Sequence, residues 1–139
     1  MHLIIDGYGN DRQVLADREV IYDLLDRYPG EIGMTKIAPP YVFRYVGVKP
    51  EDWGISGIVP IAESHIAIHT FVEKCMVNID IFSCKEFDWA RVVRDLKDRL
   101  KLTETRSYLL KRGLECSNPL EPCLPIMEVE PKVLAHNRA

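Results

Sequence analysis

The chain has 139 residues, of which 47% are hydrophobic, and its 18 basic and 21 acidic residues give a formal net charge of −3. This size and composition suit one globular domain with its own core. The charge balance excludes the basic footprint of a nucleic-acid or anionic-membrane partner. The apolar runs are far shorter than the ~20 residues of a membrane-spanning helix, and residues 1–6 lack the features of a signal peptide. We therefore expect a cytoplasmic protein.

The four cysteines, at positions 75, 84, 116 and 123, form no CxxC pair. This spacing does not predict a zinc site, and we expect no metal. Without a secretion signal the thiols are expected to be reduced, which keeps a reactive thiolate available.

The first half of the chain contains one predicted strand and one predicted helix. Residues 2–6 alternate weakly and end at Gly7, which predicts a short strand. Residues 17–28 place apolar side chains on one stripe at helical spacing. Asp17 is the expected N-cap of this helix, and Pro29-Gly30 is its expected stop.

The middle of the chain is rich in predicted strands. Residues 34–46 are expected to be extended and bent at Pro39-Pro40, and residues 49–52 form a polar turn. Three apolar or alternating segments follow closely, at 55–62, 65–71 and 76–83. Their closeness predicts antiparallel pairing.

A second helix is predicted at residues 88–100, with a last, edge strand at 103–111. Four prolines after Gly113 interrupt regular structure, so residues 116–139 are interpreted as a proline-rich tail and residues 1–115 as the folded domain. The order of elements predicts an α+β fold: a two-layer sandwich of a mainly antiparallel sheet with two helices on one face.

A motif with chemical meaning lies in the strand-rich middle. It has three parts, Gly-Ile-Ser-Gly at 54–57, Glu-Ser-His at 63–65 and Ile-His-Thr at 68–70, and Cys84 follows. Decarboxylation of an amino acid requires an electron sink. The chain is short for a pyridoxal-phosphate enzyme and has no obvious Schiff-base lysine. A serine in a tight turn can supply a ketone instead, through attack on the preceding carbonyl, elimination and hydrolysis.

These parts, in this order and spacing, resemble the self-processing region of the prokaryotic S-adenosylmethionine decarboxylase proenzymes, a pyruvoyl-dependent family. The resemblance covers roughly residues 1–115. It implies that a zymogen cuts itself between Glu63 and Ser64, giving a chain 1–63 and a chain starting at residue 64. The pyruvoyl group made from Ser64 would form a Schiff base with S-adenosylmethionine, and the decarboxylated product would supply spermidine and polyamine biosynthesis.

The resemblance also implies roles for individual residues. Ser64 is the pyruvoyl precursor, His69 assists processing, Ser56 assists processing and contacts substrate, and Cys84 donates a proton to the substrate carbon. Each residue also has an ordinary structural alternative. Ser64 could be a turn serine and His69 a half-buried strand histidine. The motif around Ser56 could be a simple bend, and Cys84 a small buried thiol. For His69 to reach Ser64, Ser64 has to lie in the turn ahead of the strand.

Three further positions are expected to bind substrate. Glu73 occupies the place of an acid at the ribose or adenine site, and Tyr45 or Phe43 is the candidate aromatic for stacking the base. The chain departs from the family pattern at Val72, where proline is frequent, and at Lys85, where glycine is common. An insert at residues 48–53 also separates the aromatic candidates from Ser56.

Other functions remain open at the sequence level. Some relatives with the same machinery act on ornithine or arginine, and a non-enzyme alternative is an inactive partner subunit. The family resemblance further implies a homodimer of cleaved protomers, with sites often built at the interface.

Overall fold

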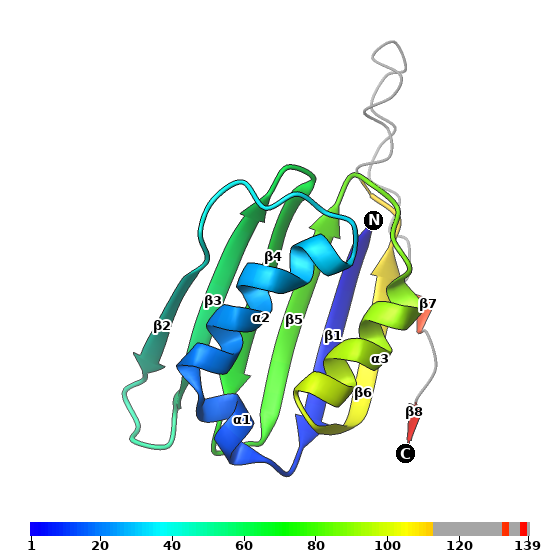
Figure 1. Ribbon diagram of the computed structural model, residues 1–139. Coiled ribbons are helices and arrows are strands. Elements are labelled where there is room, and N and C mark those ends of the chain that lie inside the picture. Colours follow the sequence, from blue (N-terminus) through cyan, green and yellow to red (C-terminus); the bar gives the residue numbers. More distant parts are fainter. Residues whose placement is uncertain (113–131, 134–136, 139) are drawn as a thin grey trace.

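The computed structural model describes residues 1–112, 132–133 and 137–138. A single sheet carries the helices on one face (Figure 1). The strands are β1 (His2–Gly9), β2 (Tyr41–Val46), β3 (Trp53–Ile61), β4 (Ser64–Phe71), β5 (Met76–Ser83), β6 (Leu102–Leu110), β7 (Lys132–Val133) and β8 (Asn137–Arg138). The helices are α1 (Arg12–Ala16), α2 (Arg18–Glu31) and α3 (Trp89–Arg99).

The strand order is β2-β3-β4-β5-β1-β6-β7, with β8 also paired to β6, and every pairing is antiparallel. The predicted α+β sandwich is confirmed, and a short third helix, α1, is added to the two expected ones. Apart from β7 and β8, the predicted tail lies outside the described residues, as do Cys116 and Cys123. Among the described helices, none is long and apolar enough to cross a membrane.

The core lies between the sheet and the helices. Alternate residues of β3, β4 and β5 are buried toward α2 and α3, because successive side chains of a strand point to opposite faces. Burying one such side chain completely contributes about 1.5–3 kcal/mol. The fully buried members include Leu25, Ile55, Ile61, Ile68, Ile79, Ile81 and Leu96.

The opposite face of the sheet is here called the open face, because all three helices of the described residues lie on the other side (Figure 1). Large apolar side chains are exposed on its β2–β3 side, where Tyr41 pairs with Ile58 and Phe43 pairs with Ser56. Tyr41 is 67% exposed and Ile58 is 42% exposed. A contiguous apolar patch on a sheet face is a common sign of an interaction surface.

The expected end of α2 at Pro29-Gly30 is wrong, because the helix runs on to Glu31. Pro29 lies in the last turn, and the stop comes at Gly33, whose φ of 76° is left-handed. The Gly33 N–H donates to the Gly30 carbonyl and the Met34 N–H donates to the Pro29 carbonyl at 2.8 Å. These two bonds are the Schellman pattern, which closes a helix through a left-handed glycine.

Two other local features differ from the expectation. Helix α1, absent from the sequence interpretation, is only five residues long, and Asp11 caps it by accepting from the Gln13 and Val14 amides. Of the segment expected to be extended, only β2 is a strand, preceded by a single bridge between Lys36 and Ile61.

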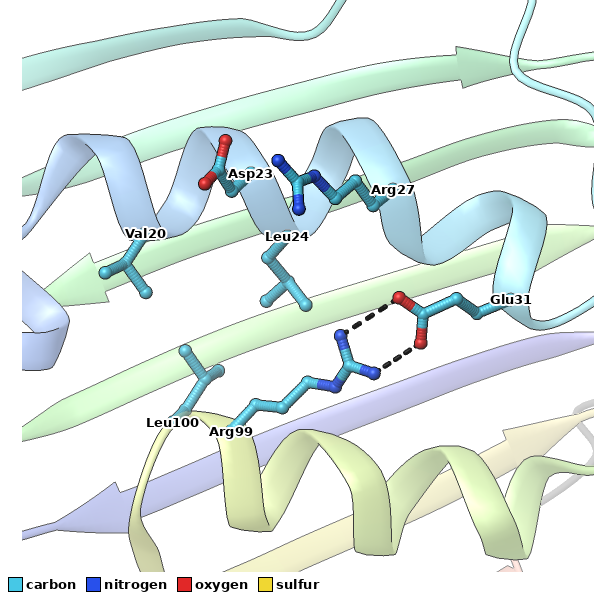
Figure 2. A pocket seen from close by; sticks show the side chains of 7 residues that line it. All are labelled: Val20, Asp23, Leu24, Arg27, Glu31, Arg99 and Leu100. Carbon is cyan, nitrogen blue, oxygen red and sulfur yellow. Dashed lines mark hydrogen bonds and ion pairs between the residues drawn. The ribbon is translucent and has the colours of Figure 1, made fainter.

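Helices α2 and α3 are joined across a groove of about 380 Å³, shown in Figure 2. Arg99 of α3 donates both terminal nitrogens to the carboxylate of Glu31 at the end of α2. Its guanidinium also lies 5.0 Å from the ring centroid of Tyr28, whose pKa is raised mainly by burial. The ion pair is exposed, so its contribution to stability is small, and each helix is held mainly by the packing of its buried side chains on the sheet.

Gly54 permits the closest approach between β3 and β4. A Cβ on this residue would lie 1.7 Å from the Thr70 carbonyl oxygen, a backbone atom that cannot move without shifting the strand. We expect Gly54→Ala to lower the free energy of unfolding by about 3 kcal/mol, at the upper end of overpacking effects. Urea unfolding in a Ser64→Ala background, which the sequence motif predicts to stay in one piece, measures this loss.

Gly30→Ala is the matched control. No atom lies within 4 Å of the Cβ that this change would add, and Gly30 is within helix α2. Alanine should therefore stabilise the helix by about 0.5–1 kcal/mol. Equal effects of the two substitutions would contradict the steric explanation for Gly54.

Candidate active site

The predicted cleavage site lies in a tight hairpin. Strand β3 ends at Ile61 and pairs with Ser64, the first residue of β4, so that only Ala62 and Glu63 form the turn. Ser64 has a φ of 156°, at the margin of the conformations that residues other than glycine adopt. The serine therefore follows the turn immediately, with an unusual backbone at the bond predicted to break.

Two contacts surround the Glu63–Ser64 peptide bond. The Cys84 N–H donates to the Glu63 carbonyl oxygen at 3.1 Å, and the Ser64 hydroxyl lies 3.1 Å from Nδ1 of His65. The exposed Cys84 follows the end of β5, which pairs with β4 through Ser64 and Ser83. The sequence motif assigns no role to His65, yet His65 is the imidazole in contact with the serine.

The segment after α2 supports the turn from the other side. The Glu63 carboxylate accepts a hydrogen bond from the Thr35 N–H at 3.0 Å, and the Thr35 carbonyl accepts one from the Ala62 N–H at 2.8 Å. Lys85, a departure from the family pattern, donates through Nζ to the Gly33 carbonyl at 2.9 Å. No local sequence signal indicates these contacts, because their partners are 27 or more residues apart. Glu63, Ser64, His65 and Cys84 are called the Ser64 cluster below.

A second cluster lies on the open face. Ser56 of β3 and His69 of β4 are directly paired, and the Ser56 hydroxyl lies 3.0 Å from Nδ1 of His69. They line a cavity of about 530 Å³ together with Tyr45 of β2. Phe43 pairs with Ser56 in the sheet but is not among the described residues that line the cavity. Ser56, His69 and this cavity are called the His69 cluster.

The two clusters lie apart within one chain. Ser64 and His69 are five residues apart on the same strand, and a strand advances about 3.3 Å per residue, which separates their backbones by about 16 Å. The pairing with β5 gives the same separation, because Ser64 lies opposite Ser83 whereas His69 lies opposite Asn78. The structure brings Ser64 to Cys84 and Ser56 to His69, but it does not bring His69 to Ser64 of the same chain.

Glu73 is held outside the cavity. Its carboxylate accepts from Arg12 at 2.9 Å and from the indole Nε1 of Trp53 at 3.2 Å. The pKa of Arg12 is raised by its contact with Cys75 and by the charge of Glu73. The insert at 48–53, which separates Tyr45 from Ser56 in sequence, folds back as the β2–β3 connection, and its Val48 and Asp52 line the cavity wall.

Comparison with known proteins identifies the family of this chain. The family model described as S-adenosylmethionine decarboxylase matches residues 1–113. A relative from Archaeoglobus fulgidus, an S-adenosylmethionine decarboxylase proenzyme, is 33% identical over 115 residues, which cover 81% of this chain and 96% of the relative. Relatives of the same name from Pyrococcus furiosus (30% identical; 82% of this chain, 78% of the relative) and Clostridium botulinum strain Loch Maree (33%; 81% and 92%) also match. The chain belongs to the S-adenosylmethionine decarboxylase family.

Proposed function

We propose that this chain is a proenzyme that cuts itself between Glu63 and Ser64, and that the mature enzyme decarboxylates S-adenosylmethionine to the aminopropyl donor for spermidine synthesis. The observation that carries the proposal is the pair of contacts at one peptide bond. A backbone N–H is directed at the Glu63 carbonyl, and an imidazole nitrogen lies beside the Ser64 hydroxyl. These are the oxyanion donor and the proton acceptor that an acyl shift requires.

The cleavage chemistry follows from these contacts. The Ser64 oxygen attacks the Glu63 carbonyl carbon while His65 accepts the hydroxyl proton, and the Cys84 N–H stabilises the oxyanion. His65 returns the proton to the Ser64 nitrogen as the peptide C–N bond breaks and leaves an ester. Transfer of the Ser64 α-proton to a base, for which we propose His69, then expels the new main-chain carboxylate of residue 63 and gives dehydroalanine. Addition of one water releases ammonia and leaves a ketone at residue 64.

The residues around position 64 fit a pyruvoyl group there. The hairpin holds the residue at its turn, and the neighbouring thiol of Cys84 is exposed. A pyruvoyl group supplies an electron-accepting carbonyl to which a substrate amine can be joined. Cys84 is proposed to deliver a proton to the substrate's α-carbon once carbon dioxide has left.

A second copy of the chain would unite the two clusters. Packing two open faces about a two-fold axis that runs between the sheets, perpendicular to the strands, reverses the strand direction of one copy. The Ser64 end of one sheet then lies over the His69 end of the other, and the same happens at the second site. Burial of Tyr41, Phe43 and Ile58 would support this contact, since all three are exposed in the single chain. We therefore propose a homodimer in which each site uses Ser64 and Cys84 from one protomer and Ser56 and His69 from its partner.

The cavity supports a nucleoside substrate over ornithine. Its described lining includes the aromatic residues Tyr45 and Phe71. Aromatic side chains suit a flat base through stacking, whereas the aliphatic chain of ornithine has no such surface. The planar guanidinium of arginine also stacks on aromatic rings, and the turnover assay below separates arginine from a nucleoside.

The mature protein should contain two fragments, residues 1–63 and 64–139. Intact mass measurement should find the second fragment blocked at its N-terminus by a pyruvoyl group. Ser64→Ala should stay in one piece and be inactive, because it removes the attacking oxygen. Fully active, uncut protein would rule out this proposal.

Release of carbon dioxide from labelled S-adenosylmethionine, ornithine and arginine by the cut enzyme assigns the substrate. We expect turnover of S-adenosylmethionine alone. Turnover of ornithine or arginine by a correctly cut enzyme would contradict the substrate assignment and leave the self-cleavage proposal intact.

Cys84→Ala should be cut at a near-normal rate, because alanine keeps the backbone N–H that contacts Glu63. Its decarboxylation rate should fall by about 100-fold or more, because a side chain that transfers a proton in the transition state usually contributes at least this factor. A time course of fragment formation and a carbon dioxide assay separate the two effects. Normal turnover would exclude Cys84 as the proton donor.

Co-expression of two inactive variants tests the proposed dimer. A Ser64→Ala protomer retains His69, and a His69→Ala protomer retains Ser64, so one complete site forms in each mixed dimer. With random pairing, about a quarter of the wild-type activity should return, and the His69→Ala chain should be cut in mixed dimers.

Ser64→Ala co-expressed with Cys84→Ala is the matched control. Both residues belong to the Ser64 cluster, so every site would lack one of them and activity should stay absent. Equal rescue in the two experiments, or none in either, would contradict a site shared between protomers.

A further inference from the structure

A buried polar side chain beside the Ser64 cluster has no role in the sequence motif. Ser83, the last residue of β5, is 0% exposed and pairs with Ser64 in the sheet. A buried hydroxyl is costly unless it is hydrogen-bonded. Ser83 Oγ donates to the Lys85 carbonyl at 2.8 Å and accepts from the Lys85 N–H at 2.9 Å. The hydroxyl therefore fixes the backbone two residues further along the chain.

These two hydrogen bonds fold the chain into a bend that contains Cys84. One end of the bend continues the pairing of β5 with β1, because the Ser83 N–H donates to the Met1 carbonyl at 2.9 Å. The other end is held by Lys85, whose Nζ donates to the Gly33 carbonyl at 2.9 Å. The Cys84 side chain between them is exposed. The direction of the Cys84 N–H is therefore set by its two neighbours and not by the packing of its own side chain.

The Cys84 N–H is the oxyanion donor of the proposed cleavage, and its nitrogen lies 3.1 Å from the Glu63 carbonyl oxygen. Such a donor accelerates a reaction only when it already points to the place where negative charge develops. Without the bend, the exposed amide could rotate toward water. A side chain that keeps the bend closed thus acts on the rate of bond breaking, although it acts through Cys84.

We propose that Ser83 is a positioning residue for self-cleavage, and that its hydroxyl holds the bend which directs the Cys84 N–H at the carbonyl attacked by Ser64. This inference rests on the proposed function and adds a residue to its first step. Ser107 of β6 offers a matched comparison, since it is also buried, at 5% exposed. Strands β5 and β1 separate β6 from β4, so Ser107 lies away from the cleavage site.

The rate of self-cleavage tests the proposal. Denaturing electrophoresis of newly translated chains follows the appearance of the two fragments with time. Ser83→Ala should be cut about 10- to 100-fold more slowly than the parent, somewhat less than the usual loss when an oxyanion donor is removed altogether. Ser107→Ala should be cut at the parent rate, because its hydroxyl does not hold the bend.

A pair of variants with the same shape isolates the hydroxyl group. Ser83→Thr and Ser83→Val add the same bulk to the buried site, but only threonine keeps an oxygen that can bond Lys85. The threonine variant should be cut at least about 10-fold faster than the valine variant. Urea unfolding of each variant in the Ser64→Ala background measures its folding, and the threonine–valine comparison decides if alanine unfolds the chain.

Hydroxylamine identifies the step that depends on Ser83, because it cleaves esters under mild conditions that leave peptide bonds intact. A His69→Ala chain lacks the proposed base for elimination, so it should accumulate the ester and give fragments when hydroxylamine is present. Adding Ser83→Ala to this chain should slow the release of fragments by about 10- to 100-fold, since the ester itself then forms slowly. Equal release from the two chains would overturn the proposal.

The outcomes separate this inference from the proposed function. Cleavage of Ser83→Ala at the parent rate, or equal rates for the threonine and valine variants, would overturn the role of Ser83 and leave the self-cleavage proposal intact. Equal slowing in Ser83→Ala and Ser107→Ala would also overturn it, because loss of any buried hydroxyl would then suffice. A parent chain that is never cut would overturn the inference together with the proposed function.

Discussion

The register between β3 and β4 is the constraint on which the site depends. One alignment of these strands places Ile61 opposite Ser64 at the turn and Ser56 opposite His69 further along. A slip of one residue would move every side chain of a strand to the other face, burying Ser56 among the helices and exposing the core. The buried side chains on the helix-facing side exclude such a slip. The hydrophobic core therefore fixes which side chains lie on the open face.

Much of this arrangement could be predicted because its causes are local in sequence. Alternation of apolar residues specified the three central strands, and Asp17 caps α2 as expected, by accepting from the Glu19 and Val20 amides. The spacing of Ser64 and Cys84 relative to two neighbouring antiparallel strands was enough to bring them together. The residue pattern at 54–57 indicates only a bend. The structure adds a steric reason for glycine at position 54, where a Cβ would collide with the Thr70 carbonyl.

The remaining features depend on contacts between distant residues. Thr35 reaches Glu63 because the chain returns after Gly33, and neither residue carries a sequence signal for that contact. Glu73 was expected to bind substrate from its position in the motif, but whether a carboxylate is available depends on Arg12, 61 residues away. His69 was expected near Ser64, but the two residues are separated along an extended strand, and we therefore propose the partner protomer as the source of that imidazole.

The placement of β1 has a consequence for any cut after Glu63. This strand belongs to the segment before the cut, yet it lies between β5 and β6, which both belong to the segment after it (Figure 1). Hydrogen bonds on both of its edges would hold the two polypeptides as one interleaved body. They could separate only by dismantling the sheet and its core, so the nicked protein would keep the cooperative unfolding of a single domain. Loss of one covalent bond would change the chain's connectivity and leave its architecture in place.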